Sequence, residues 1–231
     1  MKNINNVAVI IQARLSSQRI PKKMIKDFAG TNLTEIAVNK IKKSKIIPQN
    51  NFFLSVYESE LRDIAYQNKI QVFERSKKSA YSEGTPLTDM YEWWDKLDSR
   101  FEYVVLISAC APFLKIETID NFIDCFINSN SDGMLTVVKK NNYFWDKDGN
   151  LITRWPEGQA CMNTKVVEPT YETAQCIYGS RLDSVGKGIW MGDFQKKGEI
   201  SLFEINEVES LDVDYPSQFS LYENLYKLTR S

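Results

Sequence analysis

A cluster of cationic and hydroxyl side chains near the N-terminus has the composition of a phosphate-binding loop. Four cations and two serines lie within residues 13–23, directly after the apolar run from Val7 to Gln12. Phosphate chains are bound by spaced cationic donors and free backbone N–H groups at such positions. The segment contains neither a Walker A sequence nor a G-x-G-x-x-G sequence. It therefore predicts an anion site of another kind, and the alternative is a basic surface loop that turns at Pro21.

Two aspartates near the C-terminus have the spacing of a divalent-cation site. Asp212 and Asp214 are separated by one residue and precede Tyr215, Pro216 and a predicted final helix. Carboxylates at positions i and i+2 can share one Mg²⁺ ion, with phosphate oxygens and water completing its coordination shell. The alternative is structural, because Asp214 is also a suitable N-cap for the final helix.

The absence of histidine excludes several classes of catalysis. The chain has 231 residues and no histidine, which rules out Ser-His-Asp and Cys-His catalysis and His-ligated zinc. Any chemistry must therefore use carboxylate, Lys, Arg, Tyr, Ser or Cys side chains, or a bound cation. The 29 basic and 30 acidic residues nearly cancel, and no known nucleic-acid motif is present, so nucleic acid is not an expected partner.

The composition is that of one globular domain without disulfide or metal staples. Hydrophobic residues make up 43% of the chain and charged residues 26%, and we predict a single domain over residues 1–231. The four cysteines form no C-x-x-C pair, and Cys110 and Cys125 lie in apolar runs that predict buried thiols. No apolar N-terminal signal and no membrane-spanning apolar run are visible, so we expect a cytoplasmic protein with no membrane partner.

Strand-like and helix-like segments alternate along most of the chain. Apolar, β-branched runs predict strands at 7–12, 51–56, 70–73, 103–108, 133–138, 175–179 and 201–205. Helical spacing of apolar residues predicts helices at 33–43 (capped by Asn32), 60–68, 88–97, 116–128 and 216–229. This order predicts an α/β fold with a mainly parallel sheet and helices on both faces. Ligands of such sheets bind beyond the carboxyl ends of the strands, so the loops after Gln12, Val56, Phe73 and Ser108 are candidate sites.

The alternation is interrupted over residues 139–169. Turn-forming residues are interleaved there with Tyr143, Phe144, Trp145 and Trp155. We predict a hairpin or excursion that the main sheet carries, and the alternative is that its aromatic residues close a local core.

The basic segment at residues 13–23, together with the end of the apolar run before it, resembles the signature loop of a known enzyme family. Residues 9–23 read V-I-I-Q-A-R-x-x-S-x-R-x-P-x-K, which resembles the CMP-sugar synthetases, the N-acylneuraminate cytidylyltransferase family. The form is nearest to the branch that includes spore-coat polysaccharide cytidylyltransferase homologues. The resemblance implies the Rossmann-like fold of the nucleotide-diphospho-sugar transferases. It also implies a nucleotide-binding role for Gln12, Ala13, Arg14, Ser17, Gln18 and Lys23.

The same loop departs from the family pattern at two positions. Gln18 stands where the sialate enzymes have a catalytic lysine, and Met24 replaces an asparagine near the base. Arg19, one residue later, is the candidate for the missing cation. The resemblance thus implies that Arg14, Arg19 and Lys23 hold the leaving pyrophosphate.

Other segments resemble the family more loosely. Asp212-Val213-Asp214 resembles its D-I-D metal motif, which implies that Asp212 is catalytic and that both carboxylates hold Mg²⁺. Segments after two of the predicted strands are expected to contact the nucleotide through Arg75, Gly84 and Thr85. The expected acceptor contacts are Ser108, Tyr171, Gln175 and Arg181, with Arg154 as a further candidate.

The resemblance implies a CTP-dependent cytidylyltransferase. CMP would pass from CTP to an acidic sugar, a nonulosonic or related ulosonic acid or a similar surface-glycan precursor, and pyrophosphate would be released. The excursion resembles the dimerising insertion of the sialate synthetases, so a homodimer is expected. Two alternatives stay open, namely a nucleotidyltransferase that uses another NTP with a sugar phosphate, and a catalytically inactive nucleotide-binding homologue.

Overall fold

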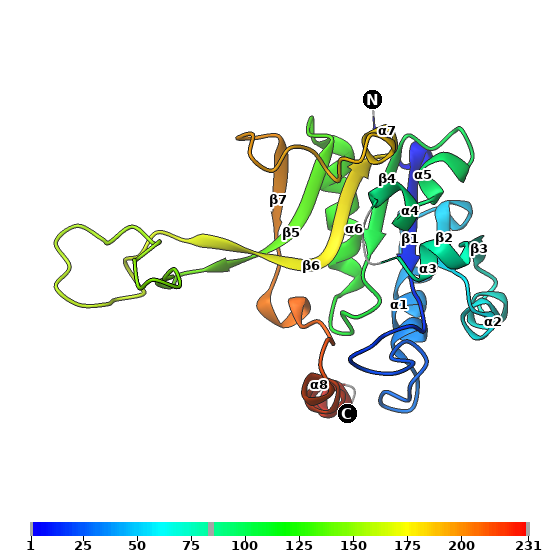
Figure 1. Ribbon diagram of the computed structural model, residues 1–231, viewed down its shortest axis with the longest axis horizontal. Helices are drawn as coiled ribbons and strands as arrows, with labels where there is room; N and C mark the ends of the chain where they lie inside the picture. The colour runs from blue at the N-terminus through cyan, green and yellow to red at the C-terminus, as the bar shows by residue number, and fades with distance from the viewer. Residues whose placement is uncertain (1, 83–85, 230–231) are drawn as a thin grey trace.

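A computed structural model describes residues 2–82 and 86–229, and their strands form one seven-stranded sheet in the order β3-β2-β1-β4-β6-β5-β7 (Figure 1). The strands are β1 (Val7–Gln12), β2 (Phe52–Val56), β3 (Gln71–Glu74), β4 (Tyr103–Ile107), β5 (Gly133–Lys140), β6 (Thr170–Arg181) and β7 (Ile200–Glu204). The α-helices are α1 (Leu33–Ile41), α2 (Ser59–Gln67), α3 (Lys77–Ala80), α4 (Leu87–Met90), α5 (Trp93–Lys96), α6 (Ile116–Asn128), α7 (Leu182–Gly186) and α8 (Pro216–Leu228). Short 3-10 helices span Ile4–Asn6, Gln49–Asn51 and Glu207–Ser210.

The sheet is mainly parallel, as the sequence predicts. Strand β1 pairs in parallel with β2 and β4, and β2 pairs in parallel with β3. Strand β7 is parallel to β5, whereas β6 runs antiparallel to both of its neighbours, β4 and β5. The amino end of β6 therefore lies at the edge of the sheet where β1 and β4 end.

The central strand β1 shows how the helices cover both faces of the sheet. Val7, Val9 and Ile11 pack in one cluster with residues of α1, α2 and α6. Ala8 and Ile10 pack in a second cluster with residues of α5 and α7. Successive side chains of a strand point to opposite faces, so a strand covered on both faces is apolar throughout. All five residues are fully buried.

Some local predictions were wrong. The predicted helix at 88–97 is two short helices, α4 and α5, because the backbone of Tyr91, with φ of −110° and ψ of 48°, leaves the helical conformation. The helices α3 and α7 were not predicted. Cys125 is exposed, because α6 turns Phe122 and Phe126 towards the core and Cys125 away from it, while Cys110 is partly buried.

Residues 139–169 form most of an arm that projects from the body of the molecule (Figure 1). The ends of β5 and β6 leave the sheet as a two-stranded ribbon, with Lys140 opposite Thr170. Lys140 forms ion pairs with Glu172 and Glu207 where the ribbon begins. None of the helices in the described residues is long and apolar enough to cross a membrane.

The loop after β1 and the C-terminal helix pack against each other. Ile20 and Phe28 from the loop share one buried cluster with Val213 and Phe219. The rings of Phe28 and Phe219 meet edge to face, with centroids 5.2 Å apart. This packing brings the basic segment of residues 13–23 next to Asp212 and Asp214, which lie about two hundred residues away along the chain.

Candidate active site

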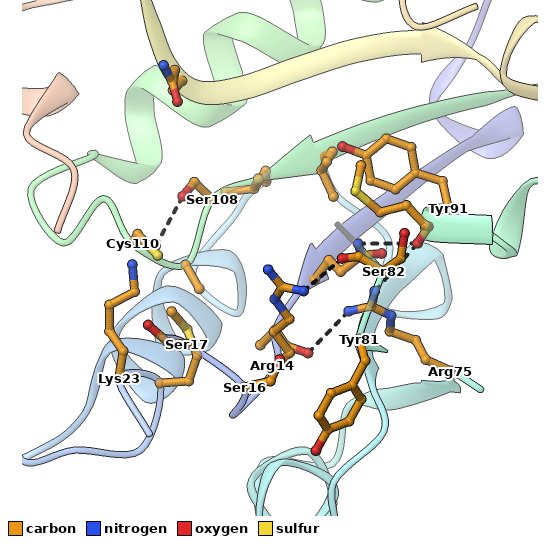
Figure 2. A pocket seen from close by; sticks show the side chains of 18 of the residues that line it. Arg14, Ser16, Ser17, Lys23, Arg75, Tyr81, Ser82, Tyr91, Ser108 and Cys110 are labelled. Carbon is orange, nitrogen blue, oxygen red and sulfur yellow. Dashed lines mark hydrogen bonds between the residues drawn. The ribbon is translucent and has the colours of Figure 1, made fainter. Parts of the chain in front are cut away.

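A cavity of about 770 Å³ opens where β1 and β4 end (Figure 2). The loop after β1, the segment between β3 and β4, the end of β4 and part of β6 form its walls. Predicted site residues that line it are Gln12, Ala13, Arg14, Ser17, Gln18, Arg19, Lys23, Arg75, Ser108 and Gln175. The position agrees with the expectation that ligands of such a sheet bind beyond the strand ends.

Arg14 crosses the cavity and holds its opposite wall. Its Nη1 donates hydrogen bonds to the carbonyl oxygens of Ser82, at 2.8 Å, and Ala80, at 3.3 Å (Figure 2). The next N–H along the chain, that of Leu15, donates to Oε1 of Glu58 at 2.9 Å. Hydrogen bonds thus hold the loop after β1 against the segments that follow β2 and β3.

Lys23 and Arg19 connect the same loop to the start of α8. The Nζ atom of Lys23 donates to the carbonyl of Val213 and lies 3.4 Å from Oδ1 of Asp214. Arg19 forms an ion pair with the same oxygen at 2.8 Å, and its guanidinium lies 5.0 Å from the centre of the Tyr215 ring. The N-cap of α8 is Tyr215, so Asp214 does not cap the helix. Each cation therefore has a carboxylate partner that a phosphate group could replace.

Asp212 presents a carboxylate oxygen without a partner. Its Oδ1 atom is shut off from solvent and accepts no hydrogen bond from the described residues. Burial, reinforced by the nearby Asp214 carboxylate, raises the pKa of Asp212 to about 6. The N–H of Val213 donates to the carbonyl of Cys110 at 2.9 Å, which fixes this segment against the end of the cavity.

An orphaned buried carboxylate is the kind of group that a divalent cation satisfies. Oδ1 of Asp212 is such a group, and the partly exposed carboxylate of Asp214, which now pairs with Arg19 and Lys23, lies two residues further along the chain. No group of three or more His, Cys, Asp or Glu side chains that could hold a metal is found in the described part of the chain. The residues present thus fit a cation that takes its remaining ligands from phosphate and water.

Arg75 lies at the back of the cavity and is 5% exposed. Its guanidinium donates to the hydroxyl and carbonyl oxygens of Ser79, at 3.0 and 2.6 Å, and to the carbonyls of Ala13 and Met90, both at 3.5 Å. Burial, with a smaller effect from Arg14, lowers the pKa of Arg75 to about 10, so it stays charged at neutral pH. In this structure it holds the wall of the cavity, and its predicted contact with the nucleotide stays a prediction.

The end of β4 contributes Ser108 and Cys110 to the cavity. The hydroxyl of Ser108 accepts a hydrogen bond from the N–H of Cys110 at 3.1 Å. Burial raises the pKa of Cys110 to about 11, so its thiol is protonated at neutral pH and is a poor nucleophile. The sequence-based view that Cys110 does not act as a nucleophile agrees with this.

Three predicted acceptor contacts do not line the cavity. Arg181 pairs in register with Tyr103 at the start of β4, because β6 is antiparallel, and it forms an ion pair with Asp183 at 2.7 Å. Tyr171 and Arg154 belong to the arm, where Tyr171 is exposed. The predictions for Gly84 and Thr85 fall outside the described residues.

Sequence reasoning missed several residues of the wall. Tyr81, Met90 and Tyr91 line the cavity and were not among the predicted site residues. Tyr91 lies within the segment predicted as one helix, and nothing in the local pattern marks the break that turns its ring towards the cavity.

A family model described as cytidylyltransferase matches residues 8–230. The chain belongs to the cytidylyltransferase family. A curated relative, the 3-deoxy-manno-octulosonate cytidylyltransferase of Francisella tularensis subsp. holarctica (strain LVS), is 25% identical over 136 residues. That match covers 58% of this cytidylyltransferase-family chain and 52% of the relative, so the chain spans about half the length of the curated relative.

Solved structures of cytidylyltransferases share the fold. A CMP:2-keto-3-deoxy-manno-octonic acid synthetase in complex with CTP has a TM-score of 0.68 at 11% identity, covering 96% of this chain and 99% of that one. A 4-diphosphocytidyl-2C-methyl-D-erythritol synthase from Anaerococcus prevotii DSM 20548 has a TM-score of 0.65 at 16% identity, covering 96% of each chain. A cytidylyltransferase from Leptospira borgpetersenii serovar Hardjo-bovis (strain JB197) has a TM-score of 0.60 at 15% identity, covering 94% and 85%. These likenesses confirm the predicted nucleotide-diphospho-sugar transferase fold.

Proposed function

We propose that this protein transfers CMP from CTP to a hydroxyl group of a sugar-like acceptor and releases pyrophosphate. The observation that carries the proposal is the contact between the loop after β1, which lines the cavity, and the segment of Asp212 and Asp214 beside it. Family membership supports CTP as the nucleotide, and so does the fold shared with a synthetase solved with CTP.

In this reaction an acceptor oxygen attacks the α-phosphorus of CTP in line. The bond from the α-phosphorus to the oxygen that bridges to the β-phosphorus breaks, and pyrophosphate leaves with that oxygen. Positioning and charge stabilisation supply most of the catalysis, so a chain without histidine can carry it out. Arg19 and Lys23 would leave Asp214 to hold the pyrophosphate, while Arg14 fixes the wall beside it.

Asp212 and Asp214 would hold a Mg²⁺ ion, since the unpartnered Oδ1 of Asp212 is suited to a cation. A bound Mg²⁺ ion would neutralise charge that develops on the phosphates. Binding of the ion is expected to compete with the two cations that now hold Asp214.

For the acceptor we propose a chemical class, and we also propose a branch of the family. An acidic sugar agrees with the 3-deoxy-manno-octulosonate specificity in the name of the curated relative. A role in surface-polysaccharide synthesis, in the spore-coat branch of the family, follows from the sequence resemblance alone.

The arm supports a homodimer. Exposed apolar side chains gather on it, and the larger ones are Phe144, Trp145, Ile152, Trp155, Met162, Val166 and Tyr171. Aromatic residues of this kind are enriched in protein interfaces. Sedimentation equilibrium should give twice the chain mass, and a monomer at micromolar concentration would contradict this proposal.

Isothermal titration with CTP, UTP, GTP and ATP tests the proposed function. CTP should bind most tightly, and Lys23→Met should weaken CTP by about tenfold or more, on the scale of one charge-assisted contact. Lys43→Met is the matched control, because Lys43 is exposed and does not line the cavity. Preference for another nucleotide would favour the alternative nucleotidyltransferase, and tight CTP binding without pyrophosphate release across an acceptor panel would favour the inactive homologue.

A further inference from the structure

Lys40 does not line the cavity, but its buried amine holds the turn that follows β4 (residues 108–115). The residue lies in the last turn of α1, and its Nζ atom donates to the carbonyl oxygens of Ala111, at 2.8 Å, and Pro112, at 3.1 Å. Removal of an amine from water is unfavourable unless hydrogen bonds within the protein replace those to water. These two hydrogen bonds therefore fix the middle of the turn to α1.

The same turn is attached to the segment that carries the two aspartates. The carbonyl of Cys110 accepts a hydrogen bond from the N–H of Val213 at 2.9 Å. Val213 stands between Asp212 and Asp214 in the chain. The two carbonyl groups that follow the one of Cys110 are those that Lys40 holds. A shift of the turn would therefore carry with it the point at which both carboxylates are attached.

Glu209 connects the turn to the aspartate segment a second time. It lies in the 3-10 helix that precedes Asp212, and it is 6% exposed. Its Oε2 atom accepts a hydrogen bond from the N–H of Lys115 at 3.0 Å, where the turn ends and α6 begins. The turn is thus tied to the aspartate segment near both of its ends, and Lys40 holds it between these two contacts.

The hydrogen bonds of Lys40 persist in either of its protonation states. Burial lowers the pKa of Lys40 to about 7, against the opposing effects of Cys176 and Glu209, so the charged and the neutral amine are both present at neutral pH. The ammonium group has three N–H donors and the neutral amine has two, which is enough for the two carbonyl oxygens. The position of the turn therefore does not depend on the charge of Lys40.

We propose that Lys40 is a positioning residue for the Mg²⁺ site of Asp212 and Asp214. It acts through the turn after β4 and through the hydrogen bond between Val213 and Cys110. The inference rests on the proposed function, because the cation belongs to that proposal. Groups that orient metal ligands without binding the metal change metal affinity by about 10–100-fold when they are removed. Lys40 acts through backbone groups one step further away, so we expect a loss near the lower end of that range.

Lys2 offers a matched control for a purely structural role. It is 8% exposed, and its Nζ atom donates to the carbonyl oxygens of Ser129, at 2.7 Å, and Ser131, at 2.9 Å. These carbonyl groups follow α6, whereas those that Lys40 holds precede it. Lys2→Met and Lys40→Met therefore make the same change in the same kind of contact at opposite ends of one helix. Both should lower stability, but Lys40→Met alone should disturb the aspartate segment.

Isothermal titration of CTP into the full chain, with and without Mg²⁺, tests the proposal. The ratio of the two dissociation constants measures how much the cation contributes to binding. Lys40→Met should lower this contribution by about tenfold and leave CTP binding without Mg²⁺ within about twofold of the wild type. Lys2→Met should leave both values unchanged. Lys40→Arg keeps the N–H donors and should retain most of the Mg²⁺ effect.

Amide hydrogen exchange on the same variants reports the connection without any ligand. The amides of β2 serve as the internal reference, because a general loss of stability speeds their exchange as well. Relative to that reference, the Val213 amide should exchange about tenfold faster in Lys40→Met and at the wild-type rate in Lys2→Met. Faster exchange confined to the aspartate segment would show that Lys40 fixes it.

The outcomes separate failure of the inference from failure of the proposed function. A Mg²⁺ effect in Lys40→Met equal to that of the wild type would overturn the inference alone. An equal loss in Lys2→Met, or Val213 exchange that does not change in Lys40→Met, would overturn it too. A wild type that does not bind CTP, or that binds it equally well without Mg²⁺, would overturn the proposed cation site and the inference with it.

Discussion

The two cations on Asp214 provide a matched test of the site's energetics. Lys23 and Arg19 both contact Oδ1 of Asp214, but the Lys23 side chain is 8% exposed and the Arg19 side chain is 50% exposed. Lys23→Met keeps the apolar stem and removes a charge-assisted hydrogen bond to the Val213 carbonyl, which should cost about 1.5–3 kcal/mol. Arg19→Met removes a solvent-screened ion pair, which should cost less than about 1 kcal/mol.

Urea unfolding followed by circular dichroism, without nucleotide, measures both costs. In thermal melts of the same samples, these costs correspond to a midpoint roughly 3–12 °C lower for the Lys23 variant and less than roughly 4 °C lower for the Arg19 variant. Double substitution should be less than additive, because both changes act on one carboxylate. Equal losses for the two single variants, or no loss for Lys23→Met, would refute the argument from burial.

Three further predictions follow from other parts of the structure. Burial lowers the pKa of Lys40 to about 7, while the unfolded chain keeps the ordinary value near 10.5, so between these limits the unfolded state binds more protons. The stability of the wild type relative to Lys40→Met should therefore rise with pH over this window, by up to about 1.4 kcal/mol per pH unit. A stability difference in urea unfolding that does not change with pH would contradict the lowered pKa. Gly133→Ala should lower the stability of the protein far more than Gly188→Ala, because a Cβ on Gly133 would lie 1.8 Å from the Met191 carbonyl oxygen. Thermal melts that rank the two variants otherwise would contradict this packing. Arg75→Lys should lower stability by about 1–3 kcal/mol and weaken CTP binding, since an ammonium group cannot reproduce the fork of hydrogen bonds to Ser79. An unchanged melting temperature together with unchanged CTP binding would refute that role of Arg75.

The elements that could be predicted from the sequence are those with a local signal. The continuous apolar run at 7–12 predicts a buried strand, and the helical spacing of apolar residues at 116–128 predicts a helix. The structure has these two elements at the same residues. The ring of Tyr91 also contacts Trp190, far away along the chain, and no local pattern marks that contact.

The direction of β6 also lay beyond the sequence. An apolar run predicts a strand at 175–179 but not whether it is parallel or antiparallel to its neighbours. Because β6 is antiparallel, Gln175 reaches the cavity while Arg181 lies beside the start of β4. One residue predicted to meet the acceptor was therefore brought to the site and the other was not.

The loop after β1 and the aspartate pair could be singled out as candidates because the residues of each set are close together in the sequence, and their roles stay predictions. The roles of Arg14 and Arg75 could not be, because they depend on carbonyl oxygens of a segment that folds over the loop. The contacts of the Trp190 ring with Tyr91 and Tyr178 join three segments that are far apart in the chain, so no local pattern predicts them.

We propose above that this cavity binds CTP, with a Mg²⁺ ion held beside it by Asp212. Thermal melts of the wild type and Asp212→Ala, with each of the four nucleotides and with or without Mg²⁺, test it most directly. At one hundred times its dissociation constant CTP should stabilise the wild type by about 2.7 kcal/mol, a rise of roughly 5–10 °C. The account predicts a CTP-selective rise that Mg²⁺ enlarges in the wild type and not in Asp212→Ala. No rise with any nucleotide, or a Mg²⁺ effect that survives the substitution, would contradict it.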